Sequence, residues 1–399
     1  MPISLQEDPI VIVGMARTPM GGFQGDLSPV TAPELGAAAI RGALDRAGVA
    51  AEEVAEVIMG CVLAAGMRQA PARQAAHGAG IPRQVGATTI NKMCGSGMRA
   101  AMFAHDQILA GSADVMVAGG LESMSNAPYL LDKARAGYRM GNGKLYDHMF
   151  IDGLEDAYEP GKLMGEFAED TAQHYQFTRE AQDEFAVTSL TRAKAANENG
   201  TFSDEIVAVT VKTRKGETVV DKDEQPFKAN LDKIPRLRPA FRKGGTVTAA
   251  NSSSISDGAA ALVLMRESGA EKRGLAPLAR ILGHATHAQE PAWFTTAPIG
   301  AINKLYERVG WTRTDVDLFE INEAFAVVTM AAMRDIGIDH DAVNVYGGAC
   351  AMGHPVGASG ARIMGALITA LRAHNLKRGI ASLCIGGGEA TAIALERAA

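Results

Sequence analysis

The order of apolar and polar positions along the chain predicts alternating strands and helices. Residues 9–14 form a short apolar run that ends in glycine, as expected for a buried strand. Residues 32–47 carry apolar side chains at near-helical spacing and are followed by Gly48, a typical helix stop. Residues 54–60 are strand-like again. This alternation predicts an α/β fold with a largely parallel sheet.

Comparison of the two ends of the chain reveals an internal duplication. Three pairs of segments match in the same order, at offsets of 262, 263 and 267 residues. They are the turns at Gly48 and Gly310, residues 96–100 and 359–363, and the apolar runs that end in Gly119-Gly120 and Gly386-Gly387. We therefore expect two halves of the same β-α topology, packed as a pseudo-symmetric pair.

A segment of different character separates the two halves. It contains an expected helix from Thr178, as N-cap, to Asn197, then a hairpin-like stretch at residues 206–220 and an irregular charged run. We interpret this insertion as a lid. The predicted domains are an N-terminal half, an inserted loop domain and a C-terminal half: residues 1–121 with 246–275, residues 122–245, and residues 276–399.

Composition narrows the class of protein. A chain of 399 residues is too long for one ordinary core. The net charge of -6 without a basic stripe argues against a nucleic-acid binder. The four cysteines are widely spaced and show no ligand spacing, so we expect neither a metal site nor a disulfide framework. Residues 1–14 resemble no targeting signal, and no apolar run is long enough for a membrane span, which favours a cytoplasmic protein.

Cys94 is the first candidate for chemistry. A β-rich run leads through Cys94-Gly95-Ser96-Gly97 into an expected helix that stops at Gly111. The positive end of a helix dipole favours the thiolate, and the glycines would let a substrate approach the backbone. The residue is therefore a candidate nucleophile, although a small buried side chain in a tight turn would give the same local pattern.

His354 is the second candidate, in a segment that has six glycines among residues 347–360. Histidine is the side chain best suited to proton transfer near neutral pH. A lone histidine is more often structural, but this loop is the repeat partner of the Cys94 loop. The duplication would bring both helix starts together, so the two side chains could meet.

Two further segments end strands at positions where α/β proteins place ligands. Cys384 precedes three glycines, although a cysteine in a strand is usually inert. Residues 320–326 hold two carboxylates and Asn322 after a predicted strand at residues 316–319. Glu323 is either a polar group of the site or an acidic residue that stabilises a helix start, and the pattern does not separate the two readings.

Together these motifs resemble the thiolase family over essentially the whole chain. The block around Cys94 is similar to its nucleophile motif, and Asn322-Glu323-Ala324-Phe325 to its NEAF motif. The segment around His354 resembles its GHP-x-GASG motif, and Cys384 with its glycines its second-cysteine motif. The resemblance implies a thiolase-like fold: two duplicated β-α halves in a layered αβαβα core with an inserted loop domain.

The resemblance also implies roles for these residues. Cys94 would accept the acyl group and be activated by His354, and Cys384 would exchange the proton at the α-carbon. His354 and a water held by Asn322 would stabilise the enolate oxygen. The backbone N–H groups of Cys94 and Gly386 would stabilise the acyl oxygen. The implied activity is acetyl-CoA C-acyltransfer by a ping-pong cycle, most simply as an acetyl-CoA acetyltransferase, with no permanently bound cofactor and coenzyme A as substrate or product.

The partners implied are acyl-CoA and CoA, in a homodimer or homotetramer. A basic cluster in the insertion could bind the CoA phosphates, or it could be a solvated charged hairpin: Lys228, Lys233, Arg236, Arg238, Arg242 and Lys243. By resemblance, a further set lines the CoA and acyl region: Ser253, Phe241, Phe325, Met164, Ala249 and Phe294.

Departures from the family pattern limit the expectation about substrate. Short-chain biosynthetic thiolases usually have His at Leu163 and Met at Phe294, and a Gly-Gly-Gly-Met-Gly segment where this chain has Glu389-Ala390. A medium- or long-chain 3-ketoacyl-CoA thiolase of β-oxidation is therefore an alternative. A ketoacyl synthase, with its Cys-His-His pattern, and a non-catalytic CoA or lipid carrier are further alternatives. The retention of all four motifs argues against the last two.

Overall fold

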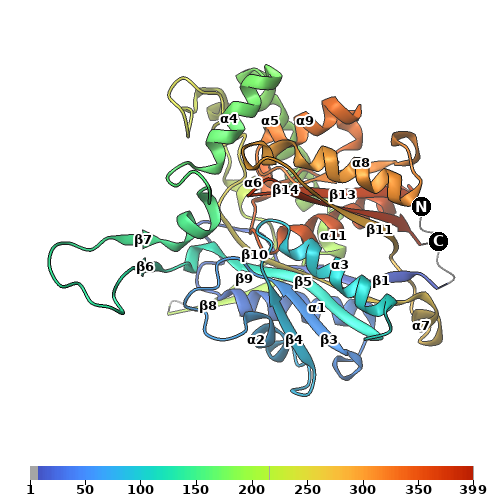
Figure 1. Ribbon diagram of the computed structural model, residues 1–399. Coiled ribbons are helices and arrows are strands. Elements are labelled where there is room, and N and C mark those ends of the chain that lie inside the picture. The colour runs from blue at the N-terminus through green and yellow to red at the C-terminus, as the bar shows by residue number, and fades with distance from the viewer. Residues whose placement is uncertain (1–7, 215, 399) are drawn as a thin grey trace.

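The computed structural model describes residues 8–214 and 216–398. The expectation of a cytoplasmic protein was drawn in part from residues 1–14. Residues 1–7 of that segment lie outside the described residues. Figure 1 shows that the hairpin of β6 (Tyr129–Leu131) and β7 (Leu145–Asp147) projects from the rest of the protein.

The main sheet has ten strands and consists of two equivalent halves. The N-terminal half has the order β4-β3-β5-β10-β1, and the C-terminal half the order β12-β13-β14-β11. The two halves join where β1 pairs with β11. The N-terminal strands are β1 (Ile10–Arg17), β3 (Glu56–Gly60), β4 (Gly86–Ile90), β5 (Val115–Ser123) and β10 (Ser256–Arg266), with β2 (Gly21–Gly22) paired to β10. The C-terminal strands are β11 (Ala279–Ala288), β12 (Leu318–Ile321), β13 (Arg378–Ile385) and β14 (Glu389–Arg397).

The predicted duplication is confirmed in this strand order. β3, β5, β10 and β1 correspond to β12, β13, β14 and β11. The counterpart of β4 is reduced to a parallel bridge between Phe319 and Val343. The helices before β3 and β12 both end in a left-handed glycine, Gly48 with φ 66° and Gly310 with φ 69°.

The expectation of a largely parallel sheet is wrong. Parallel pairing joins β3 to β4 and β5, and β12 to β13. The pairs β1–β10, β10–β5, β11–β14 and β13–β14 are antiparallel. The reason is connectivity, because β13 turns directly into β14 and β10 returns from the insertion instead of from a crossover helix.

The two halves of the main sheet form two β layers. Helices cover the outer face of each layer and fill the space between the two layers, which gives the αβαβα arrangement (Figure 1). One outer layer contains α1 (Ala32–Ala47) and α2 (Pro71–Gly78), and the other α8 (Ala297–Val309) and α9 (Ala326–Ile336). The central layer consists of α3 (Ser96–Leu109) and α11 (Ser359–Ala373), which contact each other and strands of both halves. The short helices α7 (Glu267–Lys272) and α10 (Ala349–Met352) lie in connections.

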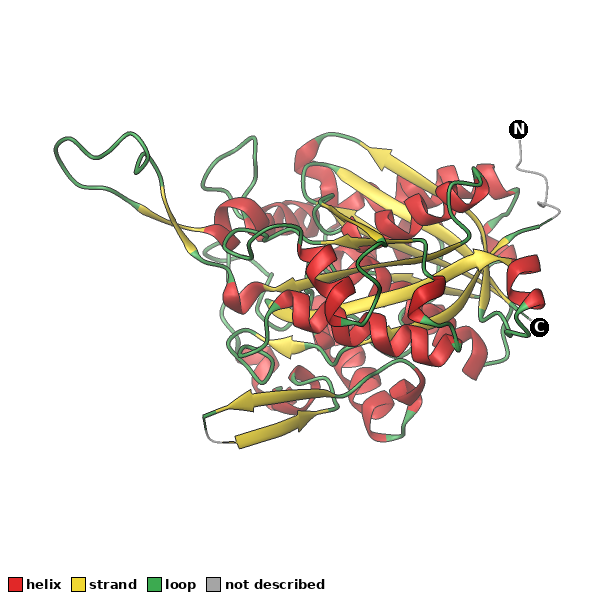
Figure 2. Ribbon diagram, turned by 90° about the horizontal axis from the view of Figure 1, so that it is seen from below, coloured by secondary structure: helices red, strands yellow, loops and turns green. Residues whose placement is uncertain are grey.

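The insertion leaves the sheet after Ser123 and returns at Ser256. Glu122 and Ser123 still pair with Gly258 and Asp257 of β10, so both belong to the sheet. The expected helix and hairpin are confirmed as α5 and the β8–β9 ribbon, which Figure 2 shows apart from the main sheet. The elements of the insertion are β6 (Tyr129–Leu131), β7 (Leu145–Asp147), α4 (Met164–Tyr175), α5 (Arg179–Glu198), β8 (Val209–Thr213), β9 (Gly216–Val220) and α6 (Gln225–Lys228).

Candidate active site

Cys94 lies in the connection from β4 to α3. The N–H of Lys92 donates to Ser96 Oγ at 2.8 Å, and this hydroxyl donates to the carbonyl of Met93 at 2.6 Å. Met93 takes a left-handed conformation with φ 46°. The first residue of α3 thus closes the turn and presents Cys94 at the start of the helix.

Two backbone N–H groups face the sulfur of Cys94. They belong to Gly386, in the turn after β13, and to Cys94 itself. Both favour the thiolate, but burial of the sulfur outweighs them and raises the pKa of the Cys94 thiol to about 11. The effect of the helix start, which the sequence analysis expected to favour the thiolate, is therefore smaller than the effect of burial, and the resting protein needs a base to remove the proton.

The glycines around Cys94 serve packing between protein segments. A Cβ on Gly97 would lie 2.9 Å from the backbone nitrogen of Ala361, and one on Gly360 would lie 2.2 Å from that of Met98. A Cβ on Gly95 would lie 2.4 Å from the side chain of Ile385. These glycines let α3 and α11 meet at their N-terminal ends, and the predicted approach of a substrate to Gly95 and Gly97 is corrected accordingly.

His354 is buried between the two halves, and its hydrogen bonds fix its tautomer. Nδ1 lies 2.5 Å from Ser359 Oγ, whose own proton is donated to the carbonyl of Pro355 at 2.9 Å. Because that proton is already used, Nδ1 must be the donor to Ser359, and Nε2 carries a free lone pair. Burial, assisted by the nearby Arg362, lowers the pKa of His354 to about 3. His354 is thus a neutral base whose buried Nε2 has no partner within the protein.

Asn322 follows the end of β12 and is fully buried. Its Oδ1 lies 3.4 Å from Nη2 of Arg362, whereas its Nδ2 has no hydrogen-bond partner within the protein. Among the side chains that the structure describes, Nδ2 of Asn322 and Nε2 of His354 are thus two of the few buried polar atoms without a partner. Such atoms are expected at a functional site.

Glu323 forms hydrogen bonds to neighbouring segments, which decides between its two interpretations, a polar group of the site or an acidic residue at a helix start. Its carboxylate accepts hydrogen bonds from Ser189 Oγ at 2.7 Å, Asn344 Nδ2 at 2.9 Å and the N–H of Cys350 at 3.0 Å. The helix α9 begins only at Ala326. Glu323 is therefore a buried structural acceptor that ties the Asn322 loop to α5 and to the segment before His354.

Cys384 lies at the end of β13, where it is fully buried. Burial raises the pKa of its thiol well above the ordinary value, and the proximity of Cys94 raises it further. The two sulfurs are thus close enough to influence each other. The structure brings Cys94, Cys384 and the N–H of Gly386 together, as the sequence predicted.

Aromatic side chains form a wall beside Cys384. Phe294 and Phe325 are buried in the same apolar cluster as Cys384, and Phe241 packs edge-on against Phe325 at 5.9 Å between ring centroids. Phe294 packs edge-on against Phe167 at 6.2 Å. Met164, the first residue of α4, joins this cluster and reaches to 3.4 Å from where Gly386 would carry a Cβ. The insertion therefore lines the site, as its interpretation as a lid predicts.

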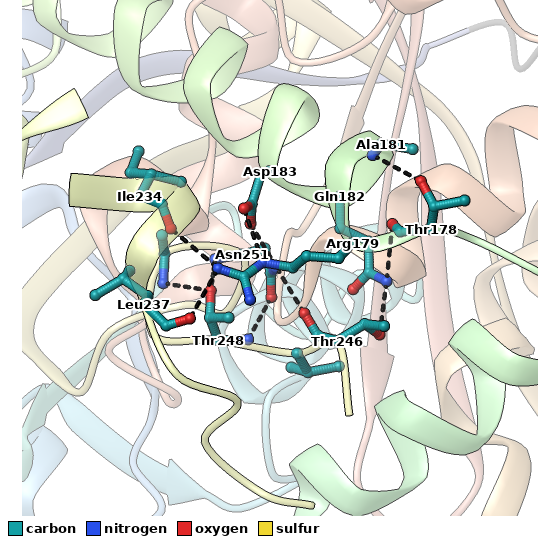
Figure 3. A network of polar contacts seen from close by, with 12 residues as sticks. Thr178, Arg179, Ala181, Gln182, Asp183, Ile234, Leu237, Thr246, Thr248 and Asn251 are labelled. Atoms are coloured by element: carbon teal, nitrogen blue, oxygen red, sulfur yellow. Dashed lines mark hydrogen bonds and ion pairs between the residues drawn. The ribbon is translucent and has the colours of Figure 1, made fainter. Parts of the chain in front are cut away.

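A polar network holds the segment that leads to Ser253 (Figure 3). Asn251 Nδ2 donates to Asp183 of α5 at 3.0 Å, and its Oδ1 accepts from the N–H of Thr248 at 2.7 Å. Ala249, between them, is exposed. The N–H of Ser253 donates to the carbonyl of Ala324 at 3.0 Å, so Ser253 adjoins the Asn322 loop.

The predicted basic cluster is not one surface of free cations. Lys228 pairs with Glu224 and, at 3.5 Å, with Asp26, and Arg242 pairs with Asp170 at 2.6 Å. Lys233, Arg236, Arg238 and Lys243 are exposed. Lys228, which we expected to contact CoA, thus has its charge balanced by two carboxylates.

Glu122 is a site residue that the sequence analysis placed in the insertion and gave no role. Its buried carboxylate accepts hydrogen bonds from the N–H groups of Val62 at 3.0 Å, Leu63 at 3.1 Å and Gly357 at 2.9 Å. It joins the N-terminal half to the glycine-rich loop of His354. Burial raises the pKa of Glu122 to about 7. Only the pairing of β5 with β10 places it here, so a linear motif carries no signal for it.

One group of potential metal ligands lies outside this site. Within the described part of the chain, His105, Asp106 and His284 have ligand atoms within 4.8 Å of one another. Asp106 Oδ1 already accepts from His105 at 3.1 Å and from His284 at 2.9 Å. These hydrogen bonds account for the cluster.

A cysteine at a helix start, a neutral imidazole with a free lone pair and a second buried thiol define an enzyme that works through a cysteine nucleophile. Comparison with known proteins identifies the family. The family model of the thiolase N-terminal domain matches residues 10–268, and the family model of the thiolase C-terminal domain matches residues 275–397. The chain belongs to the thiolase family.

Full-length relatives share about half of their residues with this chain. An acetyl-CoA acetyltransferase of Cupriavidus necator is 50% identical over 97% of this chain and 99% of that protein. Acetyl-CoA acetyltransferase 2 of Arabidopsis thaliana is 52% identical over 97% of this chain and 96% of that protein. The crystal structure of the Bacillus anthracis acetyl-CoA acetyltransferase superimposes with a TM-score of 0.95, at 43% identity, over 98% of this chain and 99% of that one. In the described residues, no helix is both long and apolar enough to cross a membrane.

Proposed function

We propose that this protein is an acetyl-CoA acetyltransferase that works through an acyl-Cys94 intermediate. The observation that carries the proposal is the convergence of the Cys94 sulfur with the N–H of Gly386 and the second thiol, Cys384. The full-length likeness to acetyl-CoA acetyltransferases supports the substrate class, acyl-CoA with CoA. CoA acts as substrate and product in this scheme.

In the first half-reaction, the free lone pair of His354 Nε2 accepts the proton of the Cys94 thiol. The sulfur attacks the thioester carbonyl, and the N–H groups of Cys94 and Gly386 stabilise the oxyanion. Collapse releases the CoA thiolate, which takes a proton from the Cys384 thiol, so that Cys384 becomes a thiolate while Nε2 of His354 keeps the proton of Cys94. Acyl-Cys94 remains.

In the second half-reaction, the Cys384 thiolate removes a proton from the α-carbon of a second acetyl-CoA. The enolate oxygen accepts hydrogen bonds from the protonated Nε2 of His354 and from a water held by Nδ2 of Asn322. The enolate carbon attacks the carbonyl of acyl-Cys94, and the departing Cys94 thiolate takes the proton from His354, which leaves 3-ketoacyl-CoA and restores the resting thiol. Cleavage is the same sequence in reverse.

Short acyl groups are favoured by the aromatic wall. Phe294 is only 3% exposed and packs on Phe167 within the cluster that contains Cys384, so it fills space that a long chain would need. A medium- or long-chain 3-ketoacyl-CoA thiolase is the alternative. If the alternative is correct, octanoyl-length 3-ketoacyl-CoA will be cleaved at least as fast as acetoacetyl-CoA.

We also propose a homodimer or homotetramer in a reducing, cytoplasmic compartment. Exposed apolar residues on the projecting β6–β7 hairpin support self-association, among them Met140 at 95% and Tyr129 at 67% exposure. The four free thiols support the compartment. Sedimentation velocity at several protein concentrations tests the assembly, and a purely monomeric profile contradicts it.

The activity is tested by incubating the protein with acetoacetyl-CoA and CoA and following the loss of 3-ketoacyl absorbance. Wild type should turn over, and Cys94→Ala should not, with circular dichroism as the control for folding. Residual activity in Cys94→Ala contradicts the nucleophile. A wild type without turnover on 3-ketoacyl-CoA of any length contradicts the proposed function.

A further inference from the structure

The duplication places an arginine at the same position of both central helices, and the two arginines have different surroundings. Arg99 on α3 is partly exposed and lies over the ring of Phe103, 4.2 Å from its centroid. Arg362 on α11 is 2% exposed. Burial of a guanidinium costs free energy unless its partners compensate for the lost hydration.

The partners of Arg362 compensate for its burial only in part. Glu320 Oε2 lies 3.7 Å from Nη1, and Asn322 Oδ1 lies 3.4 Å from Nη2. Nη1 makes no hydrogen bond within the protein. A buried guanidinium with contacts this long contributes little to the stability of the folded protein. Its presence therefore points to a role in the site.

Strand geometry explains why β12 presents these two partners. Glu320 and Asn322 are two residues apart, and alternate side chains of an extended chain point to the same side. The alternate residues Phe319 and Ile321 pack into the outer apolar cluster with α8. Glu320 and Asn322 therefore face α11 and meet Arg362 there.

Helix geometry adds a second relationship. Ser359 and Arg362 are three residues apart on α11, so they share one face of the helix. Ser359 fixes the imidazole of His354, and Arg362 contacts the amide of Asn322. One helix face thus touches both donors proposed for the enolate oxygen.

We propose that Arg362 is a positioning residue for the carbon–carbon step: its guanidinium, held by Glu320, binds Oδ1 of Asn322 and so directs Nδ2 into the site. Rotation of this amide would exchange its donor for an acceptor. The water against the enolate would then lose its orientation. The inference rests on the proposed function and assigns to Arg362 a role that acts through Asn322, apart from the effect of its charge on His354.

The test compares the two half-reactions of Arg362→Lys, which keeps the charge but loses the planar fork of donors. Carbon–carbon cleavage is followed with acetoacetyl-CoA and CoA. Acetyl transfer from acetyl-CoA to Cys94 is followed by intact-protein mass spectrometry after rapid quenching. We expect cleavage to slow about 10- to 100-fold, less than the roughly 100- to 1,000-fold cost of removing such a donor, because the lysine variant misorients the donor without removing it. Acetyl transfer, which does not use Asn322, should change less than about threefold.

Three further variants make the outcome decisive. In the Asn322→Ala background, Arg362→Lys should lower cleavage by less than about threefold, since its target is gone. Glu320→Gln should reproduce the pattern of Arg362→Lys more weakly. Arg99→Lys, at the equivalent surface position, is the matched control and should leave both rates within about twofold of wild type.

The results separate the two proposals. If wild type performs both half-reactions but Arg362→Lys slows them equally or neither, the positioning role is overturned. An undiminished effect of Arg362→Lys in the Asn322→Ala background overturns it too. If wild type performs neither half-reaction, the proposed function fails and takes this inference with it.

Discussion

Lys92 and Glu389 form an ion pair that joins the Cys94 loop to the turn of Gly386. Lys92 lies two residues before the nucleophile, and Glu389 begins β14 directly after the glycines that supply the oxyanion N–H. Glu389 stands where short-chain members of the family tend to have methionine. This ion pair therefore connects the loop that carries the Cys94 sulfur, in the N-terminal half, to the turn that carries the N–H of Gly386, in the C-terminal half. These two groups must face each other.

Removal of this pair is expected to lower kcat without unfolding the protein. Both side chains are partly exposed, so the pair contributes little to stability. A small shift between Cys94 and Gly386 is costly for catalysis. Lys92→Met and Glu389→Gln should each lower kcat about tenfold with KM little changed, and the double variant should be no worse than either alone. Lys212→Met, which breaks an exposed pair with Glu217 on the β8–β9 ribbon, is the control. Additive losses in the double variant would show that the two residues act separately.

Ser359→Ala is expected to impair proton transfer by His354. Without the hydroxyl, Nδ1 loses its acceptor, and the tautomer that leaves Nε2 free is no longer favoured. The rate of Cys94 acetylation by acetyl-CoA should fall roughly 10- to 100-fold, less than the full contribution of general acid–base catalysis, about 100- to 10,000-fold, because the imidazole itself stays in place. An unchanged acetylation rate, in a variant with wild-type circular dichroism, would refute the tautomer assignment.

His354 is expected to make the protein sensitive to acid. Its pKa, lowered to about 3 by burial, lies below the ordinary value of 6.5, so the unfolded chain binds a proton that the folded chain does not. The stability from the neutral imidazole is present above pH 6.5 and is lost as the pH falls from there toward 3. Between pH 7 and pH 5 this loss is about 2 kcal/mol of unfolding free energy.

Urea unfolding at pH 7 and pH 5 measures this dependence. Wild type should lose about 2 kcal/mol more than His354→Gln, which has no titrating ring. His374→Gln, at an exposed position, should behave like wild type. An equal loss in wild type and His354→Gln would mean that His354 titrates normally in the folded protein.

Gly97→Ala is expected to separate the helices of the central layer. Its Cβ would lie 2.9 Å from the backbone nitrogen of Ala361 and 3.0 Å from the carbonyl oxygen of Gly357, atoms that cannot move independently of the His354 loop. The melting temperature and kcat should both fall, with a cost in stability of about 1–3 kcal/mol. Gly269→Ala is the control, since that Cβ meets only the end of the flexible Arg273 side chain at 3.5 Å. A Gly97→Ala protein with normal kcat would show that the approach of α3 to α11 does not position the site.

Local patterns along the chain were sufficient for the elements and for the four motifs of the site, whereas Glu122 and Arg362 were found only from the tertiary structure. The helix at residues 32–47 is specified by its own ends, a capping box between Thr31 and Glu34 and a left-handed Gly48. The duplication and the motifs of Cys94, His354 and Cys384 could be read in the same way. Each of these depends on the order of neighbouring residues, which a sequence contains completely.

The tertiary structure decided how the strands pair and what charge each group carries. The antiparallel return of β10 and β14 depends on connections that the apolar pattern does not distinguish. Burial raises the pKa of Cys94 and lowers that of His354, and burial depends on segments distant in sequence. The same reason separates Arg99 from Arg362: at equivalent positions of a repeat, Arg99 is partly exposed over the ring of Phe103, and Arg362 is buried against Glu320 and Asn322.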